Sequence, residues 1–288
     1  MHLKGFFNLA KKSVIAWKDD DASSLGASIA FYTAFSIAPL LIIVIAIAGF
    51  VWGEDAVRGE IIRQLGGLVG QEGASGVQSL LRSADKPAQG LTATIISVGI
   101  LIVGATTVFA ELQNALDKIW KAPAREEISG IWSLLRARLL SFGLVLGLAF
   151  LLLVSMIIST LLAVMGQWTG GLLPGWELLM QALNTVVSVG IATVLFAAIY
   201  KFMPQVHIAW RDVWVGALVT AVLFEAGKFL IGLYVGKSAM ISSLTAAGSL
   251  VVVLVWVYYA AQIFLLGAEF TWIYATEHGS RSKSAPDQ

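Results

Sequence analysis

The most constraining feature of this chain is a long uncharged stretch close to its beginning. Residues 26–52 contain no Asp, Glu, Lys, Arg or His. A helix rises about 1.5 Å per residue, so this stretch is long enough to cross a hydrocarbon core of roughly 30 Å. Only 13% of the 288 residues are charged and 58% are hydrophobic, whereas soluble domains carry about 25% charged residues. The chain is therefore predicted to be an integral membrane protein.

Two faces are visible within this first stretch when it is read as a helix. Small residues repeat at every fourth position, at Gly26, Ala30, Ala34 and Ala38. Polar residues follow another face, at Ser28, Tyr32 and Ser36. A row of small residues lets a second helix approach closely, so the first face is predicted to be a packing seam. The polar face is interpreted either as part of a substrate pathway or as hydroxyls bonded to their own helix. Pro39 lacks an N–H and is expected to kink the helix.

Residues 2–18 have an apolar stripe flanked by lysines. This pattern predicts a basic amphipathic helix that lies in the membrane interface against anionic lipid. Binding of a partner protein is the alternative. Asp19, Asp20, Asp21 and Ser23 are interpreted as helix-start residues ahead of the first span.

The hydropathy pattern predicts an all-α membrane protein with six transmembrane helices. The spans are expected at about 27–52, 91–110, 139–165, 179–200, 213–235 and 248–274. Together with the N-terminal interfacial helix they form one polytopic membrane domain over residues 1–275. Residues 276–288 are expected to be a disordered tail.

The connection 53–90 is the longest polar segment between predicted spans. It is rich in glycine and mixes both signs of charge, which hydrocarbon would not accept. Short amphipathic helices are expected at 57–69 and 77–81. Five glycines argue against one long helix, at positions 66, 67, 70, 73 and 76. The connection is predicted to be a short-helix extracytoplasmic loop.

The orientation follows from the basic residues. With six spans, 13 of the 19 Lys and Arg residues flank one side of the membrane, including both termini. By the positive-inside rule both termini are predicted to be cytoplasmic. The segment 111–120 continues the second span as an amphipathic tail. Its apolar side chains are expected to face lipid, at Leu112, Leu116, Ile119 and Trp120.

Charged and polar residues inside spans are the candidate functional residues, because burying them in lipid is costly. Glu111 and Glu269 each end a span on the predicted cytoplasmic side, where Tyr32 also lies. We expect these three to surround the inner mouth of a cavity that holds a proton or cation. The alternative is that both glutamates mark where helices emerge into water. Four further residues within predicted spans are candidates for a substrate or ion pathway: Ser36, Glu225, Lys228 and Gln262.

Glu225 and Lys228 are three residues apart and are expected to pair on one helix face. The pair is interpreted either as purely structural or as a substrate or proton site.

The sequence excludes several classes of protein. There are no cysteines, and the three histidines are not spaced as metal ligands. No nucleotide-binding motif or nucleophile elbow is present. A net charge of +1 is too small to create the positive electrostatic potential that attracts nucleic acid. We therefore predict no catalytic, metal or cofactor site, and no enzymatic activity.

Five ordered motifs carry a family resemblance. They are AFYTAFSIAPLL at 30–41, ELQNALDKIW at 111–120, YKFMP at 200–204, WRDVWVGAL at 210–218 and LVWVYYAAQIFLLGAEF at 254–270. Over residues 5–275 the chain resembles the YihY/virulence factor BrkB family of bacterial inner-membrane proteins, once labelled ribonuclease BN. The resemblance implies a six-span inner-membrane protein. Motif residues expected to be structural are Pro39, Asn114, Trp120, Tyr200, Pro204, Gly216 and Gly267. A metal-dependent ribonuclease would need a His/Asp cluster that this chain lacks.

These observations predict a transporter-like or exporter-like protein for a small solute or a lipid-related substrate. The alternative is a non-transporting envelope factor that binds lipid or a partner protein. Membrane lipids are the expected partners, nucleic acid is not, and a homo-oligomer is left open. The two functions are distinguished by whether the polar groups face an accessible cavity or a closed interior.

Overall fold

The computed structural model describes residues 3–84, 91–123, 176–237 and 246–282. All regular secondary structure in these ranges is helical, as predicted. Three of the described helices contain segments long and apolar enough to cross a membrane, at Ala22–Phe50, Ala182–Phe202 and Val251–Glu277. The count of six spans stays a prediction, and the span expected at 139–165 lies outside the described residues.

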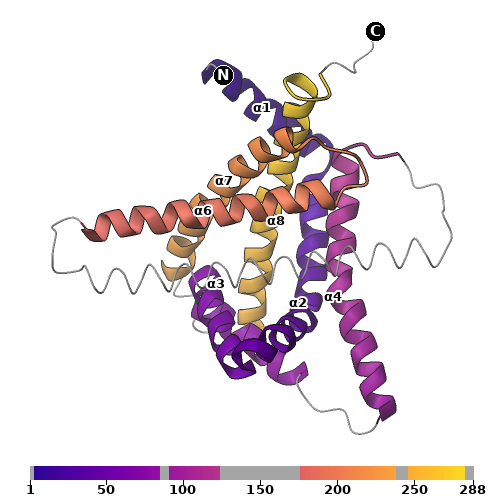
Figure 1. Cartoon of the computed structure of the whole chain (residues 1–288), viewed down its shortest axis with the longest axis vertical. Coiled ribbons are helices and arrows are strands. Elements are labelled where there is room, and N and C mark those ends of the chain that lie inside the picture. Colours follow the sequence, from indigo (N-terminus) through magenta and orange to yellow (C-terminus); the bar gives the residue numbers. More distant parts are fainter. Residues whose placement is uncertain (1–2, 85–90, 124–175, 238–245, 283–288) are drawn as a thin grey trace.

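The helices follow the order of the hydropathy pattern (Figure 1). They are α1 Leu3–Asp19, α2 Ala22–Trp52, α3 Glu54–Ala84, α4 Leu91–Ile119, α6 Trp176–Phe202, α7 Trp210–Lys237 and α8 Ala246–Glu277. The helix expected at 91–110 and its amphipathic tail form the single helix α4. The remaining apolar helices begin and end within a few residues of the predicted spans.

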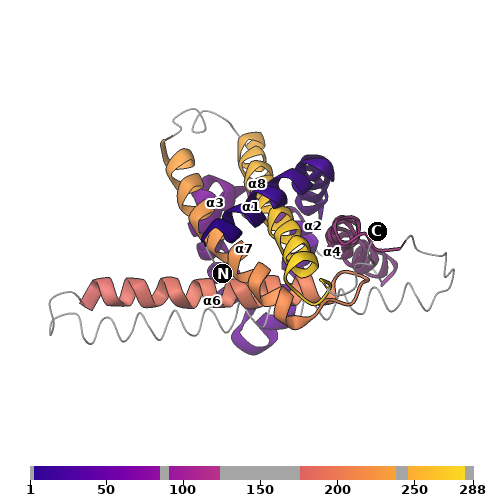
Figure 2. The ribbon, with the colours of Figure 1, turned by 90° about the horizontal axis from the view of Figure 1, so that it is seen from above.

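Helix α8 is the centre of the arrangement, because α1, α2, α3, α4 and α7 all contact it. Figures 1 and 2 show α2 and α4 running beside α8, while α1 lies across the end of α8 near the C-terminus. Helix α6 runs crosswise to these helices and packs against α7. The first part of α6 is exposed, with Val186 at 68%.

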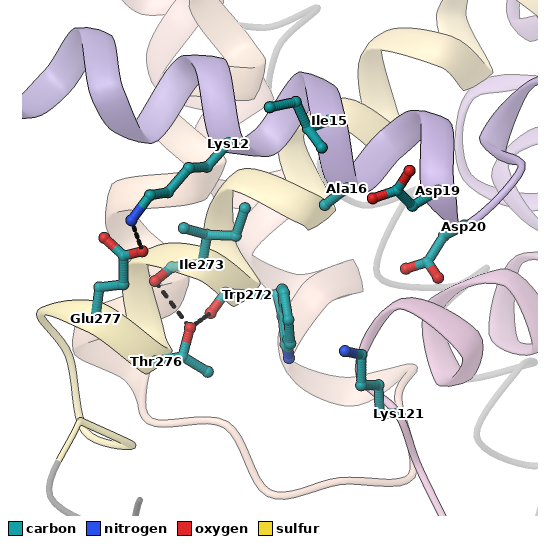
Figure 3. Close-up of a pocket in the computed structure, with 10 residues that line it drawn as sticks. All are labelled: Lys12, Ile15, Ala16, Asp19, Asp20, Lys121, Trp272, Ile273, Thr276 and Glu277. Atoms are coloured by element: carbon teal, nitrogen blue, oxygen red, sulfur yellow. Dashed lines mark hydrogen bonds and ion pairs between the residues drawn. The ribbon is translucent and has the colours of Figure 1, made fainter.

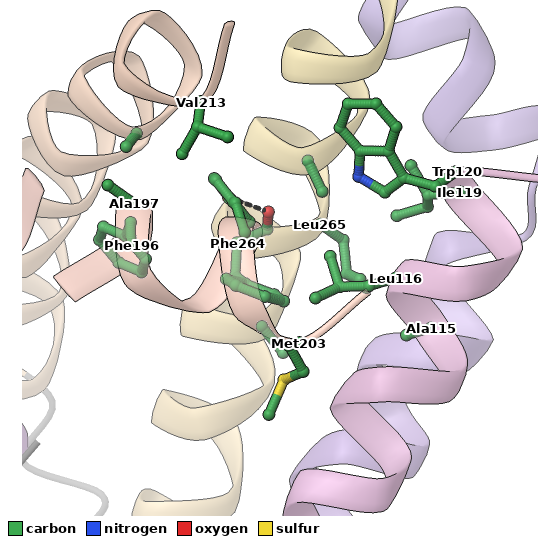
Figure 4. Close-up of a cluster of buried hydrophobic side chains, with 14 of the residues drawn as sticks. Ala115, Leu116, Ile119, Trp120, Phe196, Ala197, Met203, Val213, Phe264 and Leu265 are labelled. Atoms are coloured by element: carbon green, nitrogen blue, oxygen red, sulfur yellow. Dashed lines mark hydrogen bonds between the residues drawn. The ribbon is translucent and has the colours of Figure 1, made fainter. Parts of the chain in front are cut away.

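The largest apolar cluster joins α4, α6, α7 and α8, and Figure 4 shows part of it. Leu116, Ile119 and Trp120 at the end of α4 are at most 1% exposed. The prediction that they face lipid is therefore wrong. They pack instead against residues of the 203–208 turn and of α8, including Met203, Ile208 and Leu265. The guanidinium of Arg281 lies 5.3 Å from the centre of the Trp120 ring.

Helices α7 and α8 interlock through two glycines and two threonines. A Cβ atom on Gly216 would lie 1.7 Å from the Thr271 hydroxyl oxygen, and one on Gly267 would lie 1.9 Å from the Thr220 hydroxyl oxygen. Each glycine thus receives the threonine of the other helix. Each threonine hydroxyl donates to the carbonyl of the glycine four residues before it, at 2.8 Å for Thr220 and 2.6 Å for Thr271. Both hydroxyl groups therefore have a hydrogen-bond acceptor within their own helix. The close contact between α7 and α8 leaves neither of these hydroxyls buried without a partner.

Tyr200 connects α6 to this interlock. Its hydroxyl donates to the Phe264 carbonyl oxygen at 2.7 Å and lies 3.1 Å from the Thr220 hydroxyl oxygen. The ring is fully buried and stacks on Phe196. One side chain therefore holds three helices in register.

The small face of α2 packs as predicted. Gly26, Ala30 and Ala38 are buried. The Gln262 amide of α8 lies against Gly26 and donates to the Ala22 carbonyl oxygen at 3.3 Å. At Gly26 this face is therefore in contact with α8.

Helix α3 corresponds to the predicted short-helix loop. It is broken at Gly70, whose φ of 78° and ψ of 169° are not helical, a conformation that glycine adopts readily. Val57 and Val77, one on either side of the break, pack against Ile45 of α2 and Val253 of α8. On the polar side, Arg63 forms an ion pair with Glu60 and lowers the pKa of that carboxyl group through the hydrogen bond. The loop therefore covers one end of the bundle.

The joint between α1 and α2 differs from the expected helix start. Asp21 adopts the left-handed conformation, with φ 56° and ψ 42°, and makes no side-chain capping bond to α2. The Ser23 hydroxyl donates to the Asp21 carboxylate at 3.4 Å instead. The aspartates therefore turn the chain and leave Asp19 and Asp20 available for other contacts.

The start of the expected disordered tail is ordered. Helix α8 continues to Glu277, and a turn follows. Asp212, only 1% exposed, accepts hydrogen bonds from the Ser280 amide at 3.1 Å and the Ser280 hydroxyl at 2.6 Å. The disordered-tail prediction is therefore wrong up to residue 282, because a buried carboxylate of α7 binds this turn.

Candidate functional site

A cleft of about 360 Å³ opens at the end of the bundle where α1 crosses α8 (Figure 3). We call it the α1–α8 cleft. It is lined by Lys12, Ile15, Ala16, Asp19, Asp20, Lys121, Trp272, Ile273, Thr276 and Glu277. These residues come from α1, from the joint before α2, from the end of α4 and from α8. Three segments that are distant in sequence, 12–20, Lys121 and 272–277, therefore line one cleft.

Charged groups of both signs line this cleft. Lys12 forms an ion pair with Glu277 across its outer edge. The Lys121 ammonium lies 4.4 Å from the centre of the Trp272 ring, within the range of a cation–π contact. Beside the cleft, Lys118 donates to the backbone carbonyl oxygen of Asp20 at 2.6 Å. The carboxylates of Asp19 and Asp20 have no such cross-cleft ion pair in the described residues.

Glu269 lies one helical turn below this lining. Positions 269, 272, 273 and 276 share one face of a helix, so Glu269 continues the face of α8 that lines the cleft. Its side chain is 0% exposed, and neither carboxylate oxygen has a hydrogen-bond partner in the described part of the chain. Its electrostatic neighbours are Asp20, Lys121 and Asp19. The Asp20 side chain is also close enough to share a hydrogen bond with Glu269 when one of the two carboxyl groups carries a proton. A buried carboxyl group without any other partner is costly, so it is a candidate functional group.

Helix α1 has one side buried against α8 and the other side exposed. On one side Leu9 is buried against Phe270 and Ile273 of α8. On the other side Phe7 and Val14 are 74% and 52% exposed, and several lysines of the helix are exposed as well. A cationic helix with exposed large apolar side chains is typical of an element lying in the headgroup region.

The structure does not bring Tyr32 and Glu111 to Glu269. Tyr32 is ten residues beyond Ala22, about 15 Å along α2, and is 38% exposed. Glu111 is seven residues before Lys118, about 10 Å along α4 from the residue that contacts Asp20. The residues that do surround Glu269 are Asp19, Asp20 and Lys121.

The other polar candidates lie within helix contacts. Ser36 is 1% exposed, and its hydroxyl oxygen has no partner among the described residues. Gln262 binds the backbone of α2 through its amide nitrogen. Glu225 and Lys228 form an ion pair at 2.5 Å on α7, with side chains 28% and 23% exposed. None of the four lines the cleft.

The motif residues expected to be structural occupy several environments. Tyr200, Gly216 and Gly267 form the close contacts described above. Trp120 and Pro204 are buried, Pro39 lies partly buried inside α2, and Asn114 is exposed.

The sequence did not identify Asp19, Asp20, Lys121 or Trp272 as site residues. The three consecutive aspartates were the available signal, because a plain helix start needs only one capping side chain. Across the described ranges, no three His, Asp or Glu side chains gather in a way that would hold a metal ion.

Helices long and apolar enough to cross a membrane, with a charged cleft at one end of the bundle, define an integral membrane protein. The family model for virulence factor BrkB matches residues 14–288, and the chain belongs to this family. The assignment agrees with the resemblance seen in the sequence motifs.

Curated relatives carry the name UPF0761 membrane protein. The protein of Psychrobacter sp. is 26% identical over 94% of this chain and 49% of its own length. Those of Pseudomonas paraeruginosa and Azotobacter vinelandii are 28% and 30% identical, over 93% and 87% of this chain and 62% and 59% of their own lengths. The chain thus spans about half to three fifths of the relatives it matches. No solved structure matches it.

Proposed function

We propose that the protein is a transporter-like inner-membrane protein that binds a positively charged group or a proton at Glu269. The observation that carries this proposal is a buried carboxylate without a hydrogen-bond partner, one turn below an open cleft. A carboxylate within a membrane helix costs roughly 2.5 to 3.5 kcal/mol on insertion scales, so such groups usually serve a function. The cleft provides the route by which a charge reaches it.

The proposal includes the orientation of the protein in the membrane. The distribution of basic residues supports a cytoplasmic position for both termini by the positive-inside rule. In that orientation the α1–α8 cleft opens toward the cytoplasm. A substrate or coupling ion would enter from that side. The substrate is a small solute or a lipid-related molecule.

Charge movement tests this proposal without knowledge of the substrate. The full-length protein is reconstituted in liposomes on a solid-supported membrane, and the transient current after a pH or cation jump is recorded. We expect Glu269→Gln to reduce the displaced charge by about tenfold or more, since the titrating carboxylate is gone. Glu60→Gln in α3 is the matched control and is expected to behave as the unmodified protein.

Glu269→Asp keeps the charge and serves as the second variant if the amide variant does not fold. It is expected to retain a measurable current. No current in the unmodified protein, or an equal current in Glu269→Gln, would overturn the proposal.

A non-transporting factor that binds lipid or a partner is the second candidate. It is favoured by the interior polar groups, because Tyr200 and Gln262 are bonded to neighbouring helices. This candidate predicts a binding transient without sustained accumulation of any solute.

A further inference from the structure

We infer that the surface where α6 ends and α7 begins binds the headgroup of an anionic phospholipid. This surface, called here the α6–α7 surface, is formed by Lys201, Phe202, Trp210, Arg211, Trp214, Leu218 and Val222. None of these residues lines the α1–α8 cleft, and the inference does not depend on Glu269.

Three aromatic side chains of this surface contact one another and remain open to the outside. The ring centres of Phe202 and Trp210 are 5.7 Å apart, and those of Trp210 and Trp214 are 6.4 Å apart. Each of the three residues is between 44% and 55% exposed. Tryptophan is enriched at the level of lipid headgroups, because its ring is largely apolar and carries one N–H group. The three rings therefore indicate contact with the headgroup region.

The exposed side of α7 continues from these rings as an apolar ridge. Leu218 and Val222 follow Trp214 at intervals of four residues, so all three lie on one side of the helix. Leu218 is 51% exposed and Val222 is 52% exposed. Exposed apolar side chains in a continuous row are typical of a surface that contacts lipid or a partner. This ridge is suited to an acyl chain.

The start of α7 lies level with the end of the long apolar segment of α8. Asp212 accepts two hydrogen bonds from Ser280, which is three residues beyond the segment Val251–Glu277. Further along α7, Gly216 contacts α8 inside that segment. Arg211 is therefore at the level where α8 leaves the apolar region, and the ridge lies deeper. A lipid bound here has its headgroup and its acyl chains at the matching depths.

The two cations of the α6–α7 surface have no carboxylate partner. Lys201 and Arg211 form no ion pair within the described ranges. The Lys201 ammonium donates to the Ile208 carbonyl oxygen and lies 5.6 Å from the centre of the Trp210 ring. An ammonium group has three N–H donors, so two remain for a ligand. The adjacent carboxylate, Asp212, is buried and binds the turn after α8. Two positive charges thus remain beside the aromatic rings.

This combination favours an anionic phospholipid over a zwitterionic one. A phosphate diester carries one negative charge and accepts strong hydrogen bonds from ammonium and guanidinium groups. A zwitterionic lipid brings a cation of its own, which the two basic residues repel. In the orientation expected from the basic residues, the surface faces the cytoplasmic leaflet, whose anionic lipids attract Lys and Arg. Phosphatidylglycerol would place its phosphate at Lys201 and Arg211 and an acyl chain along the ridge.

Photo-crosslinking of the full-length protein in phosphatidylethanolamine nanodiscs tests this inference. The probe is a small, constant amount of phosphatidylglycerol with a diazirine near the glycerol end of one acyl chain, and labelled residues are mapped by mass spectrometry. We expect labels within residues 202–222. Replacing part of the phosphatidylethanolamine with a tenfold excess of unlabelled phosphatidylglycerol over the probe should reduce these labels about fivefold or more. Lipid that only passes by the surface would be labelled equally in both mixtures.

Single variants test the two cations. Arg211→Gln and Lys201→Gln are each expected to reduce the labelling about fivefold, the effect of one basic residue at an anionic membrane surface. Arg211→Lys keeps the charge and is expected to retain most of the labelling. Arg82→Gln is the matched control, because Arg82 is an exposed arginine of α3, and it should leave the labelling unchanged. Arg211 is exposed, so its variant keeps the test valid if Lys201→Gln does not fold.

Three results would overturn the inference. The first is labelling that unlabelled phosphatidylglycerol does not reduce. The second is labelling in Arg211→Gln equal to that of the unmodified protein. The third is displacement of the probe by soluble glycerol phosphate as effective as that by the lipid, which would indicate a site for a free anion. None of these results bears on charge movement at Glu269, and loss of that charge movement would leave this inference standing.

Discussion

Gly216 of α7 and Thr271 of α8 fit together so closely that a Cβ atom on the glycine would lie 1.7 Å from the threonine hydroxyl oxygen. Four residues away on each helix, Thr220 and Gly267 repeat the contact in the opposite sense. In lipid, helices gain little from hydrophobic burial against each other, so close van der Waals contact of this kind specifies which helices pair. The interlock therefore favours the pairing of α7 with α8.

The first prediction concerns this contact. Gly216→Ala is expected to destabilise the protein by about 1 to 3 kcal/mol, because the added methyl group overpacks the interface. The midpoint of thermal unfolding in detergent is the measurement. Gly190→Ala in α6 is the matched control, since a Cβ there meets nothing within 4 Å. The double variant Gly216→Ala/Thr271→Gly should recover most of the lost stability. Equal midpoints for Gly216→Ala and Gly190→Ala would contradict the interlock.

The second prediction concerns the Tyr200 hydroxyl. Tyr200→Phe removes the bond to the Phe264 carbonyl and the contact with Thr220, while the ring stays in place. We expect a loss of about 1 kcal/mol, the usual size of a hydrogen bond between membrane helices. Tyr258→Phe is the control, because Tyr258 is 37% exposed. A loss no larger than that of the control would mean that the hydroxyl does not join α6 to α8.

The third prediction concerns the turn after α8. Asp212→Ala removes both bonds to Ser280, so the turn is expected to open more often. Bonds to a charged group contribute about 1.5 to 3 kcal/mol, which corresponds to an increase of roughly 10- to 100-fold in trypsin cleavage after Arg281. Ser280→Ala removes only the hydroxyl bond and should give an intermediate rate. Unchanged cleavage in Asp212→Ala would show that the turn is held by other contacts.

The fourth prediction concerns topology. The chain has no natural cysteine, so single cysteines report their own side of the membrane. Gly59→Cys in α3 is expected to react with an impermeant maleimide added to intact spheroplasts. Ser282→Cys is expected to react only after permeabilisation, because the positive-inside rule predicts a cytoplasmic C-terminus. Labelling of both positions from the same side would reject the orientation.

The helices were predictable because each apolar stretch is long and bounded by charges. The environment of their faces was less predictable. Leu116 and Trp120 were assigned to lipid although they are buried in protein. Lipid and protein interior are equally apolar, so hydropathy alone cannot distinguish them. Small residues gave a better signal, since the face of Gly26 and Ala30 does mark a helix contact.

The candidate site was only partly predictable for a related reason. Glu269 stood out because a carboxylate within an apolar run is rare. Its neighbours Asp20 and Lys121 come from the joint before α2 and the end of α4. Their proximity depends on how the helices pack, and spacing within one helix carries no information about it. Tyr32 and Glu111 were grouped with Glu269 by sequence position, and the packing separates them.

The docking of α1 on α8 has a consequence for the synthesis of the protein. Lys12 and Glu277 are 265 residues apart in sequence, and Leu9 is buried by Phe270 and Ile273. Helix α1 leaves the ribosome before α8, and at about 5 to 20 residues per second the 265 residues between these two side chains take roughly 15 to 50 seconds to be made. During this interval the α8 residues that cover Leu9 are absent. The lysines and exposed apolar side chains of α1 are expected to hold it at the membrane surface meanwhile. Helix α1 is thus made before the other described helices but reaches its final position only after α8 has been made.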